Sequence, residues 1–288
     1  MPRVLLAAIN ENLMRICVIN NVPDEPVSRA GAQTMIEACA KGVLRTDTQI
    51  YIRGLSHAPA DSQTSPECYR DSFYQLLSTV QFVKAAIEAQ RQGFDAVIMN
   101  CFDDLGVEQA RSVVDIPVVG IGSASLFFAA QLGRRIGLIV PNLPGQIQYA
   151  ERQIADLRLS DFFLPNAIRT DGIPFAESWC QALADPKAAI ERFEPIVIDL
   201  LREGAESVIF GCGGFSLVCG AHNYNRVLLN GRTHPLVIPI TVALQRAESL
   251  VLLHENQRFP VDAPTRGSMR HSAARTAELF ASFGLPKS

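Results

Sequence analysis

Short runs of apolar residues alternate along the chain with longer segments in which apolar residues recur every three or four positions. The short runs predict buried strands at 4–10, 49–53, 95–100, 116–120, 135–140, 207–210 and 236–238. The longer segments predict helices at 29–42, 71–93, 107–113, 123–133, 145–157, 185–204 and 241–254. Strands that alternate with helices form parallel sheets covered on both faces, so the pattern predicts an α/β fold.

The order of these elements repeats along the chain. One predicted strand leads into Asn100-Cys101 and a later one into Gly211-Cys212, so the two cysteines are 111 residues apart. A helix with a glycine at its end precedes each of these strands, and a strand containing proline follows each. The repeat predicts two pseudo-symmetric Rossmann-like lobes that carry one cysteine each, with a cleft between them.

Both cysteines follow the carboxyl end of a predicted strand, which is where open α/β sheets bind their ligands. If the lobes face each other, Cys101 and Cys212 point into the cleft from opposite sides. Such a pair suits a reaction in which one group removes a proton from carbon and the other returns a proton to the opposite face. The alternative is that both are packing residues, because free cysteine is often buried. The matched surroundings of the two cysteines favour the functional interpretation.

Composition narrows the class of protein. The chain has 288 residues, a mean hydropathy of +0.14 and a net charge of −3, with no basic run that would attract nucleic acid. The uncharged stretch 116–133 contains proline and glycines, which indicates a strand and a helix rather than a membrane span. Seven scattered cysteines do not fit a secreted disulfide framework. We therefore expect a cytoplasmic homo-oligomer that acts on a small molecule, without nucleic-acid or membrane partners.

Two other motifs fail on their spacing. The stretch "GIGSAS" at 120–125 lacks the third glycine of a dinucleotide fingerprint. The possible zinc ligands Cys212, Cys219, His222 and His234 do not have the spacing of paired zinc knuckles. No compact ligand set accompanies the neighbouring aspartates at 103 and 104 either, so we expect no metal.

The two cysteine motifs resemble those of hydantoin racemases, in the aspartate/glutamate racemase superfamily. The stretch "NCFDDLGVEQARSVVDIPVVGI" is similar to the first motif and "VIFGCGGF" to the second. The stretch "INENLM" at 9–14 resembles an Asn-Pro-Asn run at the end of the family's first strand, with Glu11 in place of the proline. The resemblance covers roughly residues 3–253. It departs in the segment 215–235 and in the tail 255–288, both of which could reshape the substrate pocket.

This resemblance implies a chain that crosses between the lobes twice. Residues 1–121 plus 240–288 would form the first lobe, and residues 122–239 the second. It also implies a cofactor-independent racemase or epimerase of a hydantoin, an allantoin or a related carbonyl-activated carbon acid. Cys101 and Cys212 would then be the opposing acid/base groups.

The expected substrate-binding residues lie at the ends of strands and the starts of helices. They are Asn10, Asn12, Phe102, Asp103, Asp104, Ser123, Asn142, Gly213 and Gly214. Asparagine offers a substrate both donors and acceptors, and the N–H groups at a helix start suit a developing enolate oxygen. Asn10, Ser123 and Asn142 have an alternative interpretation as helix caps.

Other functions remain open at this point. The superfamily also contains cis–trans isomerases and decarboxylases of small diacids, and a non-catalytic protein could bind a metabolite between two lobes. Decarboxylases of this kind generally use a single cysteine, so the presence of both Cys101 and Cys212 weighs against that activity.

Overall fold

The computed structural model describes residues 13–57, 71–257 and 271–284. The predicted strand 4–10, and with it Asn10 and Asn12, lies outside the described residues. Within the described part, no helix is long and apolar enough to cross a membrane.

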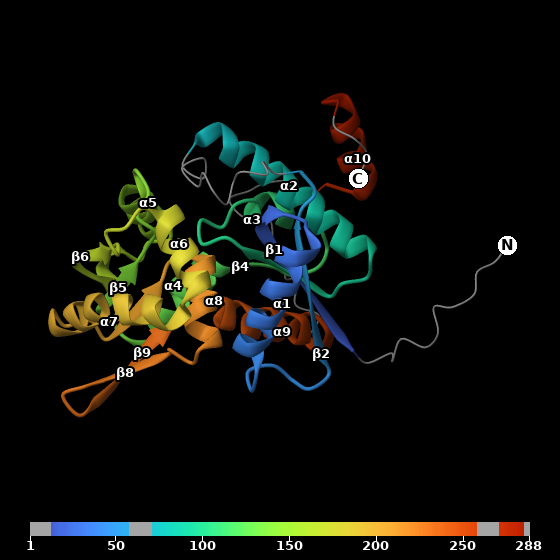
Figure 1. Cartoon of the computed structure of the whole chain (residues 1–288). Helices are drawn as coiled ribbons and strands as arrows, with labels where there is room; N and C mark the ends of the chain where they lie inside the picture. The colour runs from blue at the N-terminus through green and yellow to red at the C-terminus, as the bar shows by residue number, and fades with distance from the viewer. Residues whose placement is uncertain (1–12, 58–70, 258–270, 285–288) are drawn as a thin grey trace.

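Two sheets form two lobes, which Figure 1 shows on either side of α1 and α8. The first sheet has the order β2-β1-β3-β4 and is parallel throughout. Its strands are β1 (Met14–Pro23), β2 (Thr48–Leu55), β3 (Ala96–Asn100) and β4 (Val118–Gly120). The second sheet has the order β6-β5-β7-β9-β8. Its strands are β5 (Ile136–Ile139), β6 (Phe163–Arg169), β7 (Ser207–Phe210), β8 (Arg226–Leu229) and β9 (Arg232–Val237).

The strand orders confirm the internal repeat. In each sheet the first strand along the chain is paired with the second on one side and with the third on the other. The cysteine-bearing strand is the third in both lobes: β3 leads into Cys101 and β7 into Cys212. The α/β fold with two pseudo-symmetric lobes is therefore as the sequence predicts.

Helices cover both sheets. They are α1 (Pro26–Ala40), α2 (Ser72–Arg91), α3 (Val107–Arg111), α4 (Ile121–Leu132), α5 (Gln146–Asp156), α6 (Phe175–Ala184), α7 (Pro186–Arg202), α8 (Gly213–Ala221), α9 (Pro239–Gln257) and α10 (Ala273–Ser282). Local sequence explains several starts, since Asp71 and Asp185 each accept a backbone N–H at the beginning of α2 and α7. In α1, the buried positions Ala32, Ile36, Cys39 and Ala40 have the spacing of one helix face.

The sequence pattern missed five of these elements. Strands β1, β6 and β8 and helices α6 and α10 have no counterpart among the predicted elements. β8 pairs with β9 in the antiparallel direction, so the second sheet is not wholly parallel. The turn between them is Asn230-Gly231 with φ of 52° and 75°, the conformation that Asn-Gly adopts in tight hairpins.

The lobes pack directly on each other. α1 of the first lobe packs on α8 of the second, and α4 packs on α9. α9 follows the second sheet in the chain, yet it packs on β3 and β4 of the first sheet. One core cluster contains residues of both sheets, among them Ile98 and Ile209. The expected boundaries near residues 121 and 240 and the expected homo-oligomer stay predictions.

Candidate active site

A cavity of about 410 Å³ lies between the lobes, at the carboxyl ends of the central strands. Residues at the end of β1, and residues at or just after the ends of β3, β5 and β7, line it, together with one face of α1 and one face of α6. The cavity therefore occupies the place where paired α/β lobes offer strand ends from both sides.

Cys101 and Cys212 both line this cavity. Cys101 is half-buried, and Cys212 is 8% exposed. Their loops touch, because a Cβ atom on Gly213 would lie 3.0 Å from the main-chain oxygen of Asn100. The residue after one cysteine is thus packed against the residue before the other, and the structure brings the two thiols to a single cavity.

Cys212 is the residue immediately before α8, and two opposing influences act on its thiol. Burial raises the pKa of Cys212 to about 11, while the backbone N–H groups of Phe215 and Gly214 lower it. The carboxylates of Asp103 and Asp171 raise it further. With this pKa, Cys212 carries its proton near neutral pH.

Two asparagines that the sequence analysis did not select lie beside the cysteines. Asn100 Nδ2 donates to Asn20 Oδ1 over 2.7 Å, and both residues line the cavity at paired positions of β3 and β1. Within the described part of the protein, the buried Asn100 Oδ1 has no hydrogen-bond partner. A buried acceptor of this kind is normally satisfied, so a bound ligand with an N–H or O–H group would complete it. The signal was available in the chain, because Asn100 directly precedes Cys101 and an asparagine pair ends the apolar run 16–19.

The other expected substrate-binding residues divide into two groups. Phe102, Asp103, Gly213 and Gly214 line the cavity with the cysteines. Ser123 and Asp104 instead line a separate hollow of about 1080 Å³, which shares Asp103 with the cysteine cavity. Asn142 follows β5 but does not line the cysteine cavity, whereas its neighbours Pro141 and Leu143 do.

Asp104 and Ser123 have a structural role at the start of α4. The carboxylate of Asp104 accepts the backbone N–H of Gly122 over 2.8 Å and that of Ser123 over 2.7 Å. Burial nevertheless raises the pKa of Asp104 to about 6. Ser123 lies inside α4, and so is not the helix cap that the sequence suggested as the alternative. Both residues hold the Cys101 loop against α4, away from the thiols.

The walls of the cavity are mainly apolar. α1 contributes Val27, Ala32 and Met35, and α6 contributes Phe175, Trp179 and Leu183. Val27 and Leu183 are 84% and 50% exposed, although they are large apolar residues. A ligand with an apolar substituent would therefore remove apolar surface of both helices from water.

Among the residues that the structure describes, no group of three or more histidine, cysteine, aspartate or glutamate side chains is placed to hold a metal ion. Cys212 and Cys219 are free cysteines, as are the others in this part of the chain.

Comparison with known proteins agrees with this arrangement. A sequence model of the Asp/Glu/Hydantoin racemase family matches residues 28–247. The hydantoin racemase of Paenarthrobacter aurescens is 28% identical over 83% of this chain and 92% of its own length. The allantoin racemases of Klebsiella pneumoniae and Pseudomonas fluorescens have similar structures, with TM-scores of 0.64 and 0.62 at 21% and 22% identity. Their matches cover 90% and 88% of this chain, and 96% and 98% of those chains. The structural likeness supports the two-lobe fold.

Proposed function

The chain belongs to the Asp/Glu/Hydantoin racemase family, an isomerase family, and we propose that it racemises a hydantoin-type ring by a cofactor-independent two-base mechanism. Cys101 and Cys212 are the opposing acid/base groups of this proposal. The observation that carries it is that both cysteines line one cavity from opposite lobes, each within two residues of the end of the third strand of its sheet.

The reaction needs one thiolate and one thiol. The thiolate removes the proton from the ring carbon next to the carbonyl, and the thiol donates a proton to the opposite face, so the pair exchanges its protonation state in each turnover. The pair has two singly protonated forms, one with a Cys212 thiol and one with a Cys212 thiolate, and burial, which raises the pKa of Cys212, favours its thiol. The two forms serve opposite enantiomers.

The asparagine pair supplies polar contacts to the ring. We propose that Asn100 Oδ1 accepts a ring N–H, which would satisfy this buried oxygen. Asn20 holds the Asn100 amide in place through the 2.7 Å hydrogen bond to Nδ2. The N–H groups at the start of α8 lie beside Cys212, where they favour negative charge.

The apolar walls favour a hydantoin whose ring carbon carries an apolar substituent. The ureido group of allantoin would lose water against Met35, Trp179 and Leu183 without gaining polar partners from them. The proposed substrates are therefore 5-substituted hydantoins with aliphatic or aromatic groups. Measuring kcat/KM for 5-benzylhydantoin and for allantoin tests this choice, and a preference for allantoin would contradict it.

Single cysteine substitutions test the two-base mechanism. Cys101→Ser and Cys212→Ser should each abolish net racemisation, because serine is too weak a base to replace a thiolate near neutral pH. One variant should still exchange the ring-carbon proton of one enantiomer with solvent deuterium, and the other variant that of its mirror image. NMR in heavy water measures this exchange.

Cys180→Ser is the matched control, since Cys180 is an exposed cysteine on α6 that does not line the cavity. This variant should keep its racemase activity. If either Cys101→Ser or Cys212→Ser retains turnover, the protein does not use two opposing thiols.

A further inference from the structure

We infer that Asp171, Ser178 and Arg192, here called the Asp171 triad, form a positioning site that sets the geometry of Cys212 through α6 and Trp179. None of the three residues lines the cysteine cavity. The inference rests on the proposed function only where it concerns the acid/base role of Cys212.

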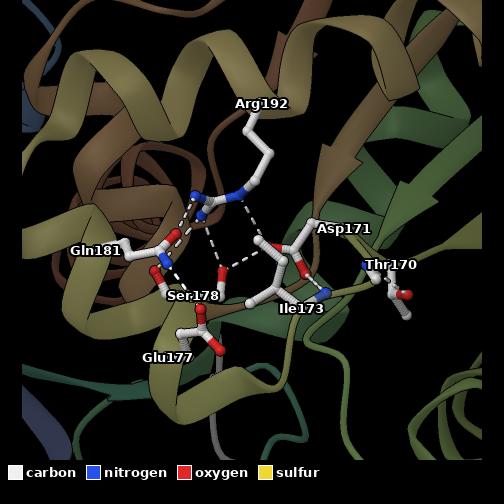
Figure 2. A network of polar contacts seen from close by, with 8 residues as sticks. Thr170, Asp171, Ile173, Glu177, Ser178, Gln181 and Arg192 are labelled. Carbon is white, nitrogen blue, oxygen red and sulfur yellow. Dashed lines mark hydrogen bonds and ion pairs between the residues drawn. The ribbon is translucent and has the colours of Figure 1, made fainter.

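The triad joins three segments of the second lobe, as Figure 2 shows. Arg192 of α7 donates through Nε to Asp171 over 3.2 Å and through Nη2 to the Ser178 hydroxyl oxygen over 2.9 Å. Ser178 of α6 in turn donates its hydroxyl hydrogen to the Asp171 carboxylate. The Asp171 side chain is 1% exposed and that of Arg192 is 19% exposed. A buried charge pair is retained at a cost in desolvation, which points to a role beyond general stability.

The triad fixes a helix that is otherwise weakly anchored at its start. α6 has ten residues and begins after Pro174, with no side-chain cap. Isolated helices of this length are marginal in water. Ser178 lies on the buried face of α6, and Arg192 also donates to Gln181 on the same helix over 2.9 Å. The triad therefore holds α6 to α7 and to the loop that follows β6.

α6 in turn contacts the residues that surround the Cys212 thiol. A Cβ atom on Gly214 would lie 2.6 Å from Trp179 Cζ3, so the indole is packed directly against the backbone of Gly214. The Phe175 and Phe215 rings meet edge to face with centroids 5.5 Å apart, and the Trp179 ring lies 6.3 Å from that of Phe215. Gly214 and Phe215 supply the N–H groups that act on Cys212. A shift of α6 would therefore move these donors relative to the sulfur.

The triad also acts on Cys212 through charge. The carboxylates that raise the pKa of Cys212 are those of Asp103 after β3 and Asp171 after β6. The neighbouring thiols are Cys219 on α8 and Cys101, which lines the same cavity. Arg192 is the ion-pair partner of Asp171. Removing Arg192 leaves the Asp171 carboxylate without this partner, and its negative charge then raises the pKa of Cys212. Removing the charge of Asp171 instead leaves the Arg192 cation, which favours a thiolate and lowers the pKa of Cys212.

The test measures the alkylation rate of Cys212 by iodoacetamide between about pH 8 and about pH 12.5, a range that extends beyond the Cys212 pKa of about 11. Mass spectrometry of the Cys212 peptide follows the reaction, because only the thiolate reacts. The variants are Asp171→Asn, Arg192→Gln and Arg192→Lys in the full chain. Arg169→Gln is the matched control, since Arg169 pairs with Glu203 over 3.0 Å in a more exposed ion pair of the same lobe. Cys39 and Cys219 are buried and, unlike Cys212, do not line the cavity, so they should stay unmodified in any variant that folds.

We expect the midpoint pH of Cys212 alkylation to fall in Asp171→Asn and to rise in Arg192→Gln, each by about half a pH unit or more. Arg192→Lys should restore most of the midpoint, because it restores the positive charge. The control should not move it. A loss of racemisation with unchanged alkylation midpoints would overturn the triad proposal and leave the proposed reaction standing. If the midpoints shift as expected but the protein has no racemase activity, the triad proposal stands and the proposed reaction is overturned.

Trp179 emission is a second measurement that does not depend on charge, since the chain has one tryptophan. Ser178→Ala keeps both charges but removes the hydroxyl link from α6 to Asp171. We expect increased acrylamide quenching of Trp179 in this variant, with the far-UV circular dichroism unchanged. Alkylation midpoints that move in the same direction in Asp171→Asn and Arg192→Gln, or quenching equal to that of the native protein, would overturn the proposal.

Discussion

Cys212 is a buried thiol on which two opposing influences act. Burial raises its pKa to about 11, so the thiol holds its proton, while the N–H groups of Phe215 and Gly214 stabilise the thiolate and lower this pKa. The other buried thiols lack such donors: desolvation raises the pKa of Cys39 to about 12, with only the Thr241 side chain lowering it. The position before α8 therefore distinguishes Cys212 from cysteines that are only packing.

The pKa of Cys212 predicts the pH dependence of racemisation. In the proposed two-base mechanism, turnover needs one thiol and one thiolate, so kcat/KM should fall at high pH as the last thiol loses its proton, with an alkaline limb near pH 11. It should also fall at low pH, as the remaining thiolate gains a proton. Because the enantiomers are equal in energy, both directions must show the same two limbs.

Polarimetry with an N3-methylated hydantoin checks this prediction, since such a ring has no ionisable N3–H. The uncatalysed rate at each pH has to be subtracted. An alkaline limb below about pH 9 would contradict the assignment of Cys212 as the thiol that keeps its proton up to high pH.

At the scale of elements, the loop after β3 is held by close packing against the start of α4. A Cβ atom on Gly122 would overlap the main-chain oxygen of Phe102, and Gln153 of α5 donates to that same oxygen over 2.7 Å. Asp104 then accepts the first free N–H groups of α4. These contacts fix the direction in which the Cys101 loop enters the cavity.

Gly122→Ala tests this packing. The steric overlap should cost about 1–3 kcal/mol of unfolding free energy or more, which exceeds the roughly 1 kcal/mol that alanine gains over glycine in a helix. Gly31→Ala on α1 is the comparison, because its Cβ atom would have nothing within 4 Å. Urea unfolding should show Gly122→Ala less stable than the native protein, and Gly31→Ala equal or more stable. Equal stability of the two variants would contradict this prediction, because the backbone at Phe102 would then move aside at little cost in free energy.

At the scale of the whole molecule, the two lobes share one core. The cluster that contains Ile98 of the first sheet also contains Ile209 of the second, and the α1–α8 and α4–α9 contacts join the lobes on either side. A second cluster, around Phe82 and Val97, belongs to the first lobe alone. The shared core holds the two cysteine loops at a constant separation.

We therefore predict that the lobes unfold together. Urea unfolding followed by Trp179 emission, which reports on the second lobe, should coincide with hydrogen-exchange deprotection of β1 peptides from the first lobe. The physical reason is that separating the lobes would expose apolar surface of the shared cluster to water. Two transitions at different urea concentrations would show that the interface between lobes is weaker than the core suggests.

The sequence by itself determined the fold class, the internal repeat and the two cysteine loops. These depend on local patterns. β3 and β7 are short apolar runs. Helix α2 begins after a capping aspartate, Asp71, and is followed by Gln92 and by Gly93, which has a φ of 74°. A buried parallel strand must be apolar along its whole length, so its signal survives without knowledge of its neighbours. The carboxyl ends of such strands then point to the site.

The tertiary structure decided which polar residues belong to the site. Asn20 reaches the cavity because β1 pairs with β3 so that Asn20 lies opposite Asn100, a register that no local pattern contains. Asp104 turns away from the thiols because the N–H groups of α4, far along the chain, bind its carboxylate. The Asp171 triad likewise unites residues up to 21 positions apart. Hydrogen bonds and ion pairs between distant segments depend on how the elements pack, and that packing is a property of the whole chain rather than of any stretch of it.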